Sequence, residues 1–240
     1  MMDASSHSRS KFALNFALIL LVGLAVLFAK VRDASAIDGV SEINAAVVGT
    51  AFPYAISQPG SYRLTGNLNP PSGTDAIDIS ANNVTLDLNG FSIIGAGGSG
   101  GNGIAGSGSH VTVRNGTVTG MGGNGISLGP NAIVEDVHVA GNGGNGIVTG
   151  TAGQVRHSSV SNNTGIGIFL NGSGGAAIEN IVNSNSGVGL QMYDTSSAFA
   201  FNTFLFNDGN VSLGNPNNQV LGTGTANQVG NNLCNDAACN

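Results

Sequence analysis

The sequence contains no tryptophan, only two cysteines and few charged residues. Charged residues make up 8% of the 240-residue chain, whereas a typical soluble domain has about 25%. Four of the seven basic residues and two of the 13 acidic residues lie within residues 1–36, which leaves three arginines, no lysine and 11 acidic residues. The remaining net charge of about −8 makes nucleic acid and anionic membranes poor partners, because both need a basic surface.

Glycine is abundant instead, with 39 residues, yet 41% of the chain is hydrophobic, so the composition is not that of a disordered protein. Many of the glycines belong to one recurring motif, which ends as GGNGIAG at Gly106, GGNGISL at Leu128 and GGNGIVT at Thr149. Its apolar anchors recur at a nearly constant interval, at Ile104, Ile126, Ile147, Ile168, Leu190 and Val211. Such a regular period predicts a solenoid, in which each unit buries its apolar face against its neighbours.

Each repeat contains short β segments and no stretch long enough for a helix. Within residues 133–139, Val137 and Val139 alternate with His138, as a strand with one buried face requires. The Gly-Asn run at 141–146 supplies residues that turn a strand onto the next face. A leucine-rich repeat is the competing interpretation, but the other repeats do not keep its consensus and a second β segment replaces its convex helix. We therefore predict an all-β parallel β-helix of about six or seven rungs.

The N-terminus has the features of an export signal. Arg9 and Lys11 precede an apolar run over 12–29, and Ala34-Ser35-Ala36 matches a signal-peptidase site. We predict a signal peptide over 1–36 and a secreted, periplasmic or cell-surface protein that leaves the membrane after cleavage. An uncleaved N-terminal anchor is the alternative, because the run approaches the length of a membrane span.

Three further segments follow this signal. Residues 37–74 are predicted to form an N-terminal cap with the first strands, residues 75–228 the rungs, and residues 229–240 a C-terminal tail. Cys234 and Cys239 both lie in the tail, and in an exported protein they are expected to form a disulfide.

Stacked rungs place equivalent residues in columns, and two columns can be read from the spacing. One is a predicted hydrogen-bonded ladder of asparagines, which comprises Asn142, Asn163, Asn185 and Asn207. Four late phenylalanines are expected to close the C-terminal end of the core, namely Phe199, Phe201, Phe204 and Phe206.

The second column is charged and faces outward. Equal steps along the chain align Arg114, Glu135 and Arg156, and Asp87 is expected one rung before Arg114. Such a row could be a shallow polysaccharide groove in which the acids hold Ca²⁺ and an arginine takes a proton from a uronate sugar. It could also be a salt-bridge ladder, which the alternating signs favour, since metal sites need clustered carboxylates. Asp136 and His157 form a neighbouring pair of possible acid–base residues.

Several segments together resemble a known group of proteins: PGSYRLTGNL, NNVTLDLNGFSIIG, SHVTVRNGTVTG, the GGNGI repeats and the tail NNLCNDAAC. The sequence is similar to exported bacterial right-handed parallel β-helix repeat proteins of the pectate-lyase-like superfamily. That resemblance implies carbohydrate binding, or a polysaccharide lyase, epimerase or hydrolase. The DPHD signature of alginate epimerases is missing, as are the NTD, GHG and RIK segments of polygalacturonases and the acidic cluster of pectate lyases.

We therefore expect an exported, non-catalytic protein that binds or presents extracellular or cell-wall polysaccharide, with no cofactor and no metal. An enzyme with a diverged site is the first alternative, and only a lyase-like enzyme would need Ca²⁺. Its candidate catalytic residues are Asp87, Arg114, Glu135, Asp136, Arg156 and His157. A structural or adhesive surface protein is the second alternative.

Overall fold

The computed structural model describes residues 39–193 and 196–207, and the short segments 220–222, 227–228, 231–234 and 237–238. The predicted signal peptide, 1–36, lies outside the described residues. The chain from Gly39 onward forms one compact unit, and the account below concerns that unit alone.

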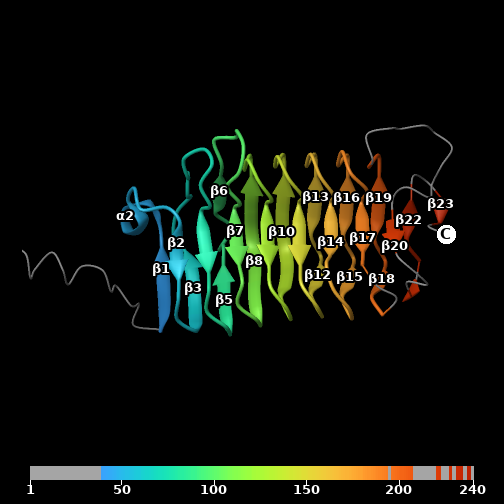
Figure 1. Ribbon diagram of the computed structural model, residues 1–240, viewed down its shortest axis with the longest axis horizontal. Helices are drawn as coiled ribbons and strands as arrows, with labels where there is room; N and C mark the ends of the chain where they lie inside the picture. The colour runs from blue at the N-terminus through green and yellow to red at the C-terminus, as the bar shows by residue number, and fades with distance from the viewer. Residues whose placement is uncertain are drawn as a thin grey trace, which may run out of the picture. The chain divides into compact units, whose positions relative to one another are not determined.

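Parallel strands stack in chain order along the long axis of this unit, as Figure 1 shows. The result is a parallel β-solenoid of about seven turns, so the predicted fold class is confirmed. The described residues contain one helix, the single turn α2 (Ala45–Val48), which Asn44 caps by accepting the Ala46 and Val47 N–H groups. None of the described residues belongs to a helix long and apolar enough to span a membrane.

Each rung contributes strands to three faces. The first face contains β2 (Tyr54–Ile56), β4 (Ile77–Ile79), β7 (Ile104–Gly106), β9 (Ile126–Leu128), β11 (Ile147–Thr149), β14 (Ile168–Leu170), β17 (Leu190–Met192) and β20 (Val220–Gly222). The second contains β1 (Val40–Ile43), β3 (Gly60–Leu64), β5 (Val84–Asp87), β12 (Gln154–Arg156), β15 (Ala176–Ile178), β18 (Ala198–Ala200) and β21 (Asn227–Gln228). The third contains β6 (Ser92–Ile94), β13 (Ser159–Ser161), β16 (Ile181–Asn183), β19 (Thr203–Leu205) and β22 (Leu233–Cys234), beside which β23 (Ala237–Ala238) runs antiparallel.

Two long strands join the second and third faces. β8 (Val111–Thr119) and β10 (Ile133–Ala140) run through the corner without a break, and both halves of each strand pair with the neighbouring rungs. At the corner, Asn115 and Asp136 adopt left-handed backbone conformations, with φ of 60° and 53°. Asn and Asp tolerate this conformation better than other residues with a side chain, which explains their place at the turn.

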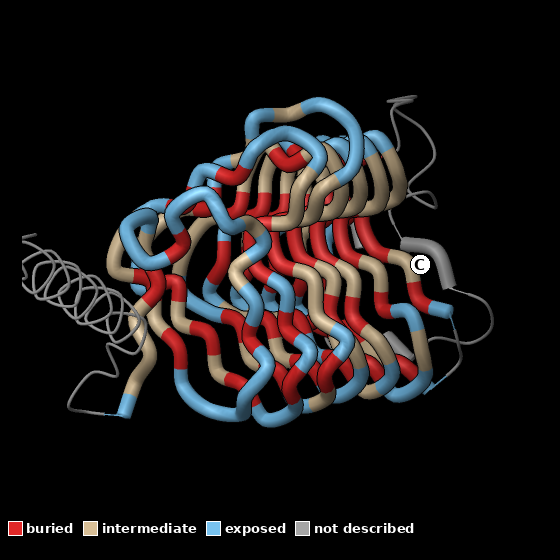
Figure 2. The backbone as a smooth tube through the Cα atoms, turned by 60° about the vertical axis from the view of Figure 1, so that its left-hand side comes forward, coloured by how far each residue is buried: buried red, intermediate tan, exposed pale blue. Residues whose placement is uncertain are grey.

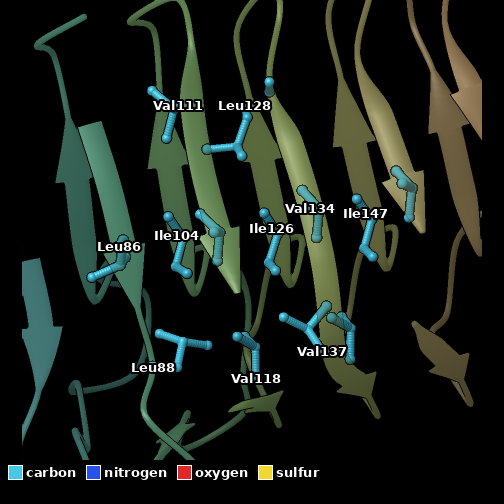
Figure 3. Packing of buried hydrophobic residues seen from close by; sticks show 14 of the residues in the cluster. Leu86, Leu88, Ile104, Val111, Val118, Ile126, Leu128, Val134, Val137 and Ile147 are labelled. Carbon is cyan, nitrogen blue, oxygen red and sulfur yellow. The ribbon is translucent and has the colours of Figure 1, made fainter. Parts of the chain in front are cut away.

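The hydrophobic core runs the length of the solenoid. Ile104, Ile126 and Ile147 are fully buried and lie one above another on consecutive rungs, as Figure 3 shows. In Figure 2 the buried positions of successive rungs line up in the same way. Because an inward side chain contacts its equivalents one rung away, the regular period of the sequence corresponds directly to columns in the core.

The asparagine column is a continuous buried ladder. The Nδ2 groups of Asn142, Asn163 and Asn185 each donate to the Oδ1 of the next asparagine, at 2.8, 2.9 and 2.8 Å, and the last acceptor is Asn207. Each of these Oδ1 atoms also accepts the backbone N–H of the preceding asparagine. The neighbouring Gly146 has no room for a side chain, since a Cβ there would lie 2.3 Å from Val160 Cγ1.

A second ladder was not predicted. Asn180 and Asn202 donate through Nδ2 to the Oδ1 of the next member, and the column ends at Asn232. Ser158 begins it, because its backbone N–H donates to Asn180 Oδ1. The second ladder lies at the corner between the second and third faces, where it satisfies backbone groups that no strand pairing reaches.

Two expectations for the C-terminal rungs are wrong. Leu190 pairs with Val220 and not with Val211, which lies outside the described residues, because the last step of the first face is longer than the earlier ones. Phe199 and Phe204 are buried and their rings pack edge to face at 6.5 Å, but Phe201 is 56% exposed.

The exposed phenylalanines have a geometric explanation. Phe201 and Phe206 follow strands at corners where the backbone is left-handed, and both side chains are exposed there. The expected disulfide stays a prediction: Cys234 is fully buried in β22, and Cys239 lies outside the described residues.

Asn163→Ala should lower the free energy of unfolding by about 3 kcal/mol, because it leaves two buried donors of Asn142, the backbone N–H and Nδ2, without their acceptor and removes one of the two hydrogen bonds to Asn185 Oδ1. Asn183→Ala is the matched control on a less buried position of β16 and should change stability by less than about 0.5 kcal/mol. Equal urea-unfolding free energies for the two variants would contradict a stabilising role for the ladder.

Tyr62 makes stability sensitive to alkali. Its hydroxyl donates to the Gln58 carbonyl at 2.9 Å, and burial raises the pKa of this phenol above its ordinary value. The raised pKa favours the neutral form in the folded state, so stability holds below about pH 10 and falls as the pH rises through the folded-state pKa. Tyr62→Phe should lose about 1 kcal/mol at pH 7 but decline less steeply between pH 9 and 11. If the urea-unfolding free energies of the unmodified protein and of Tyr62→Phe fell in parallel between about pH 9 and 11, the alkaline loss of stability would not come from Tyr62.

Candidate functional site

The charged row lies along the last outward position of the second face, just before the corner. Register pairs Asp87 with Arg114, Arg114 with Glu135, and Glu135 with Arg156. The structure extends the row toward the N-terminus by two residues that sequence analysis did not place in it, Glu42 and Arg63. The complete row therefore alternates in sign over six rungs: Glu42, Arg63, Asp87, Arg114, Glu135 and Arg156.

Within the row, each arginine forms a salt bridge with the carboxylate one rung before it. Arg63 lies 3.2 Å from Glu42, and Arg114 lies 3.2 Å from Asp87. Arg156 contacts Glu135 Oε2 through Nε at 2.8 Å and through a terminal nitrogen at 2.5 Å. The arginine side chains are 33 to 47% exposed, so solvent screens these pairs and each contributes at most about 1 kcal/mol.

A histidine between two carboxylates lies on the corner beside this row. His157 Nε2 is 2.6 Å from Glu179 Oε2, and His157 Nδ1 is 3.9 Å from Asp136 Oδ1. All three residues have left-handed backbones and side chains that are about half exposed or more. Sequence analysis paired Asp136 with His157 but missed Glu179, because the step from His157 to the next rung is longer than the step that precedes it.

This corner offers acid–base groups on an exposed surface. A general acid or base works best when it is held against a substrate in a site that excludes water. His157 and its two carboxylates stand on an outward corner, and the remaining candidates are joined in salt bridges. Over the residues that the structure describes, no group of three or more His, Cys, Asp or Glu side chains is arranged to hold a metal ion.

The first face carries a different kind of row. On each rung its central residue points outward between two inward neighbours, and register aligns these residues over seven rungs. The row consists of Ala55, Asp78, Ala105, Ser127, Val148, Phe169 and Gln191. From Ala105 to Gln191 it contains no charged side chain, whereas the described arginines all lie in the charged row of the second face.

Two aromatic rings meet on the first face. Phe169 is the outward residue of β14, and Tyr193 follows directly after the neighbouring strand β17. Their ring centroids are 5.8 Å apart and their planes are tilted by 40°. Tyr193 is 59% exposed. The pair was not predicted from the sequence, because nothing in the linear sequence places Tyr193 beside Phe169.

Comparison with protein families identifies the group to which the chain belongs. The family described as "Right handed beta helix region" matches residues 65–204, which is more than half of the chain. The chain is a right-handed β-helix family member. The match begins within the predicted cap and ends in β19, so it covers the charged row from Asp87 onward and the aromatic Phe169 and Tyr193.

Comparison with individual proteins adds little to this family assignment. No curated protein sequence matches the β-helix chain significantly. Among solved structures, the A-module of the mannuronan C-5 epimerase AlgE4 from Azotobacter vinelandii is similar at 11% sequence identity and a TM-score of 0.34. That alignment covers 76% of this chain and 78% of the module.

The charged row of this β-helix is expected to be a solvated ladder with weak, separable pairs. A double-mutant cycle on Glu135→Ala and Arg156→Ala should give a coupling free energy of about 0.5–1 kcal/mol, and 1 M NaCl should reduce it. The control cycle on Arg63→Ala and Glu135→Ala, which are three rungs apart, should be additive within about 0.5 kcal/mol. A Glu135–Arg156 coupling above about 2 kcal/mol, unchanged by salt, would instead indicate a desolvated functional cluster.

Proposed function

We propose that this β-helix protein is exported and binds or presents extracellular or cell-wall polysaccharide along its first face, without catalysing a reaction on it. The observation that carries the proposal is the row of outward side chains from Ala55 to Gln191. Seven rungs at about 4.8 Å per step make this row about 29 Å long. An outward-facing and at least partly exposed row of this length suits an extended polymer, since sites for small molecules are concave pockets.

The separation of charge between faces supports a binding role on the first face. The charged row occupies the second face and its members neutralise one another in pairs. The first face from Ala105 to Gln191 is formed by small, polar or aromatic side chains. Hydroxyl-rich polymers can approach such a surface without the desolvation of ionic groups, which would oppose binding.

The candidate catalytic residues are already paired or stand on an exposed corner, which disfavours catalysis. A lyase or epimerase needs a base that is free to take a proton from the sugar, and a neighbouring group that stabilises the resulting negative charge. Arg114 and Arg156 are engaged with Asp87 and Glu135. His157 lies on an outward corner and its side chain is 49% exposed, whereas a general base works best when it is held against its substrate. Export is supported by the basic and apolar N-terminal segment and its Ala34-Ser35-Ala36 site.

The test is size-exclusion chromatography with light scattering on the purified protein mixed with hydroxyethyl cellulose, polygalacturonate or alginate, each with and without Ca²⁺. We expect the protein to co-elute with at least one polymer whose mass stays unchanged. Proton NMR of the recovered polymer would detect an epimerisation that leaves the mass intact. A shortened or epimerised polymer would establish an enzyme, and the absence of co-elution with every polymer would favour a structural or adhesive role.

A further inference from the structure

The first face has one place where its lining changes from small side chains to large aromatic ones. Ala105, Ser127 and Val148 precede Phe169 in the outward row. Tyr193 stands beside Phe169, and Gln191 is the register partner of Phe169 on β17. An outward-facing aromatic pair is notable on this solenoid, because 5% of the chain is aromatic and tryptophan is absent.

The geometry points to a sugar-binding subsite formed by Phe169, Tyr193 and Gln191 that selects neutral pyranose polymers over polyuronates. This inference rests on the proposed function, of which it specifies the ligand class. Strands β14 and β17, which carry Phe169 and Gln191, are neighbours on the first face, and Tyr193 directly follows β17. Figure 1 shows where these two strands lie along the solenoid.

Ring stacking supplies the affinity. The face of an aromatic ring carries partial negative charge. When all hydroxyl groups of a pyranose are equatorial, both of its faces consist of C–H groups with partial positive charge, so that the sugar can lie on Phe169 or Tyr193. A gluco-configured ring has this arrangement. The Gln191 side chain, which is partly exposed, can both donate and accept hydrogen bonds with the equatorial hydroxyls.

The angle between the rings favours a chain over a single sugar. Centroids 5.8 Å apart and planes tilted by 40° cannot both lie parallel to one pyranose. Each aromatic ring therefore suits a different sugar unit, or a different face of a bent segment. The row of small side chains from Val148 toward Ala105 leaves the adjoining surface open for the rest of the polymer.

Charge gives the selectivity. A polyuronate carries one carboxylate on each sugar, and stable binding requires cations at the surface. The described arginines lie on the second face and are bonded to carboxylates, so none is presented beside Phe169. The negative net charge of the protein adds repulsion at low salt. A neutral polymer has no carboxylates, so it needs no cation at the surface and is not repelled by the negative charge of the protein.

The test compares single variants in affinity electrophoresis through gels that contain hydroxyethyl cellulose or polygalacturonate. Phe169→Ala and Tyr193→Ala should each weaken the apparent Kd for hydroxyethyl cellulose by about five- to tenfold. Phe169→Tyr keeps an aromatic ring and should bind almost as well as the unmodified protein. Phe201→Ala is the matched control, because it removes an exposed phenylalanine at the corner between the other two faces and should leave the Kd unchanged. Thermal unfolding of each variant checks that the fold is retained.

The outcomes separate this inference from the proposed function. Binding of hydroxyethyl cellulose that is weakened by Phe169→Ala and Tyr193→Ala, and not by Phe201→Ala, would support the subsite. Binding that neither variant weakens would overturn the subsite and leave the proposed function standing. Tighter retardation by polygalacturonate than by hydroxyethyl cellulose would overturn the selectivity for neutral polymers. If the unmodified protein binds neither these gels nor any polymer in solution, the proposed function fails and the subsite fails with it.

Discussion

Stacking of each rung on its own equivalent is the constraint on which the rest of this structure depends. A residue at one position mainly contacts the residues at the same position one rung before and one rung after, so each column must contain residues that tolerate one another. Isoleucine packs on isoleucine in the core, and Asn142 bonds to Asn163 because an amide can both donate and accept. Charged side chains meet the same requirement only by alternating in sign, which is how Arg114 comes to lie between Asp87 and Glu135.

This constraint makes much of the fold predictable from the spacing of residues. The period indicated a solenoid, and the Gly-Asn runs, which exclude helices, indicated that this solenoid is a parallel β-helix. It also placed Arg114, Glu135 and Arg156 in one row, since the steps between them are equal. The prediction fails where the step changes. The steps from Arg63 to Asp87 and from Asp87 to Arg114 are both longer than the later ones, so the first two members of the row escape a search for a fixed period.

A change of step also explains the error at the last rung of the first face. The long step from Leu190 to Val220 cannot be anticipated from the shorter rungs that come before it. Phe201 and Phe206 belong to a cluster that looks uniformly apolar in the sequence, but the left-handed corners on which they lie have exposed side chains. The aromatic pair was missed for a different reason. Phe169 and Tyr193 lie at non-equivalent positions of consecutive rungs, and only the three-dimensional path of the chain brings their rings together.

The interior and the exterior of the solenoid therefore contribute differently to stability. Removing a buried asparagine side chain leaves buried donors of the preceding rung unsatisfied, whereas removing an exposed arginine breaks a screened pair of small energy. Outward rows can consequently change in sequence without loss of the fold, and one β-helix scaffold can present different surfaces. In this protein the two outward rows differ. A self-neutralised charged row lies on the second face, whereas the row on the first face is largely uncharged and contains Phe169, with Tyr193 beside it. Because the charged groups already satisfy one another, the ligand that we propose for the first face would bind there without first breaking an ion pair.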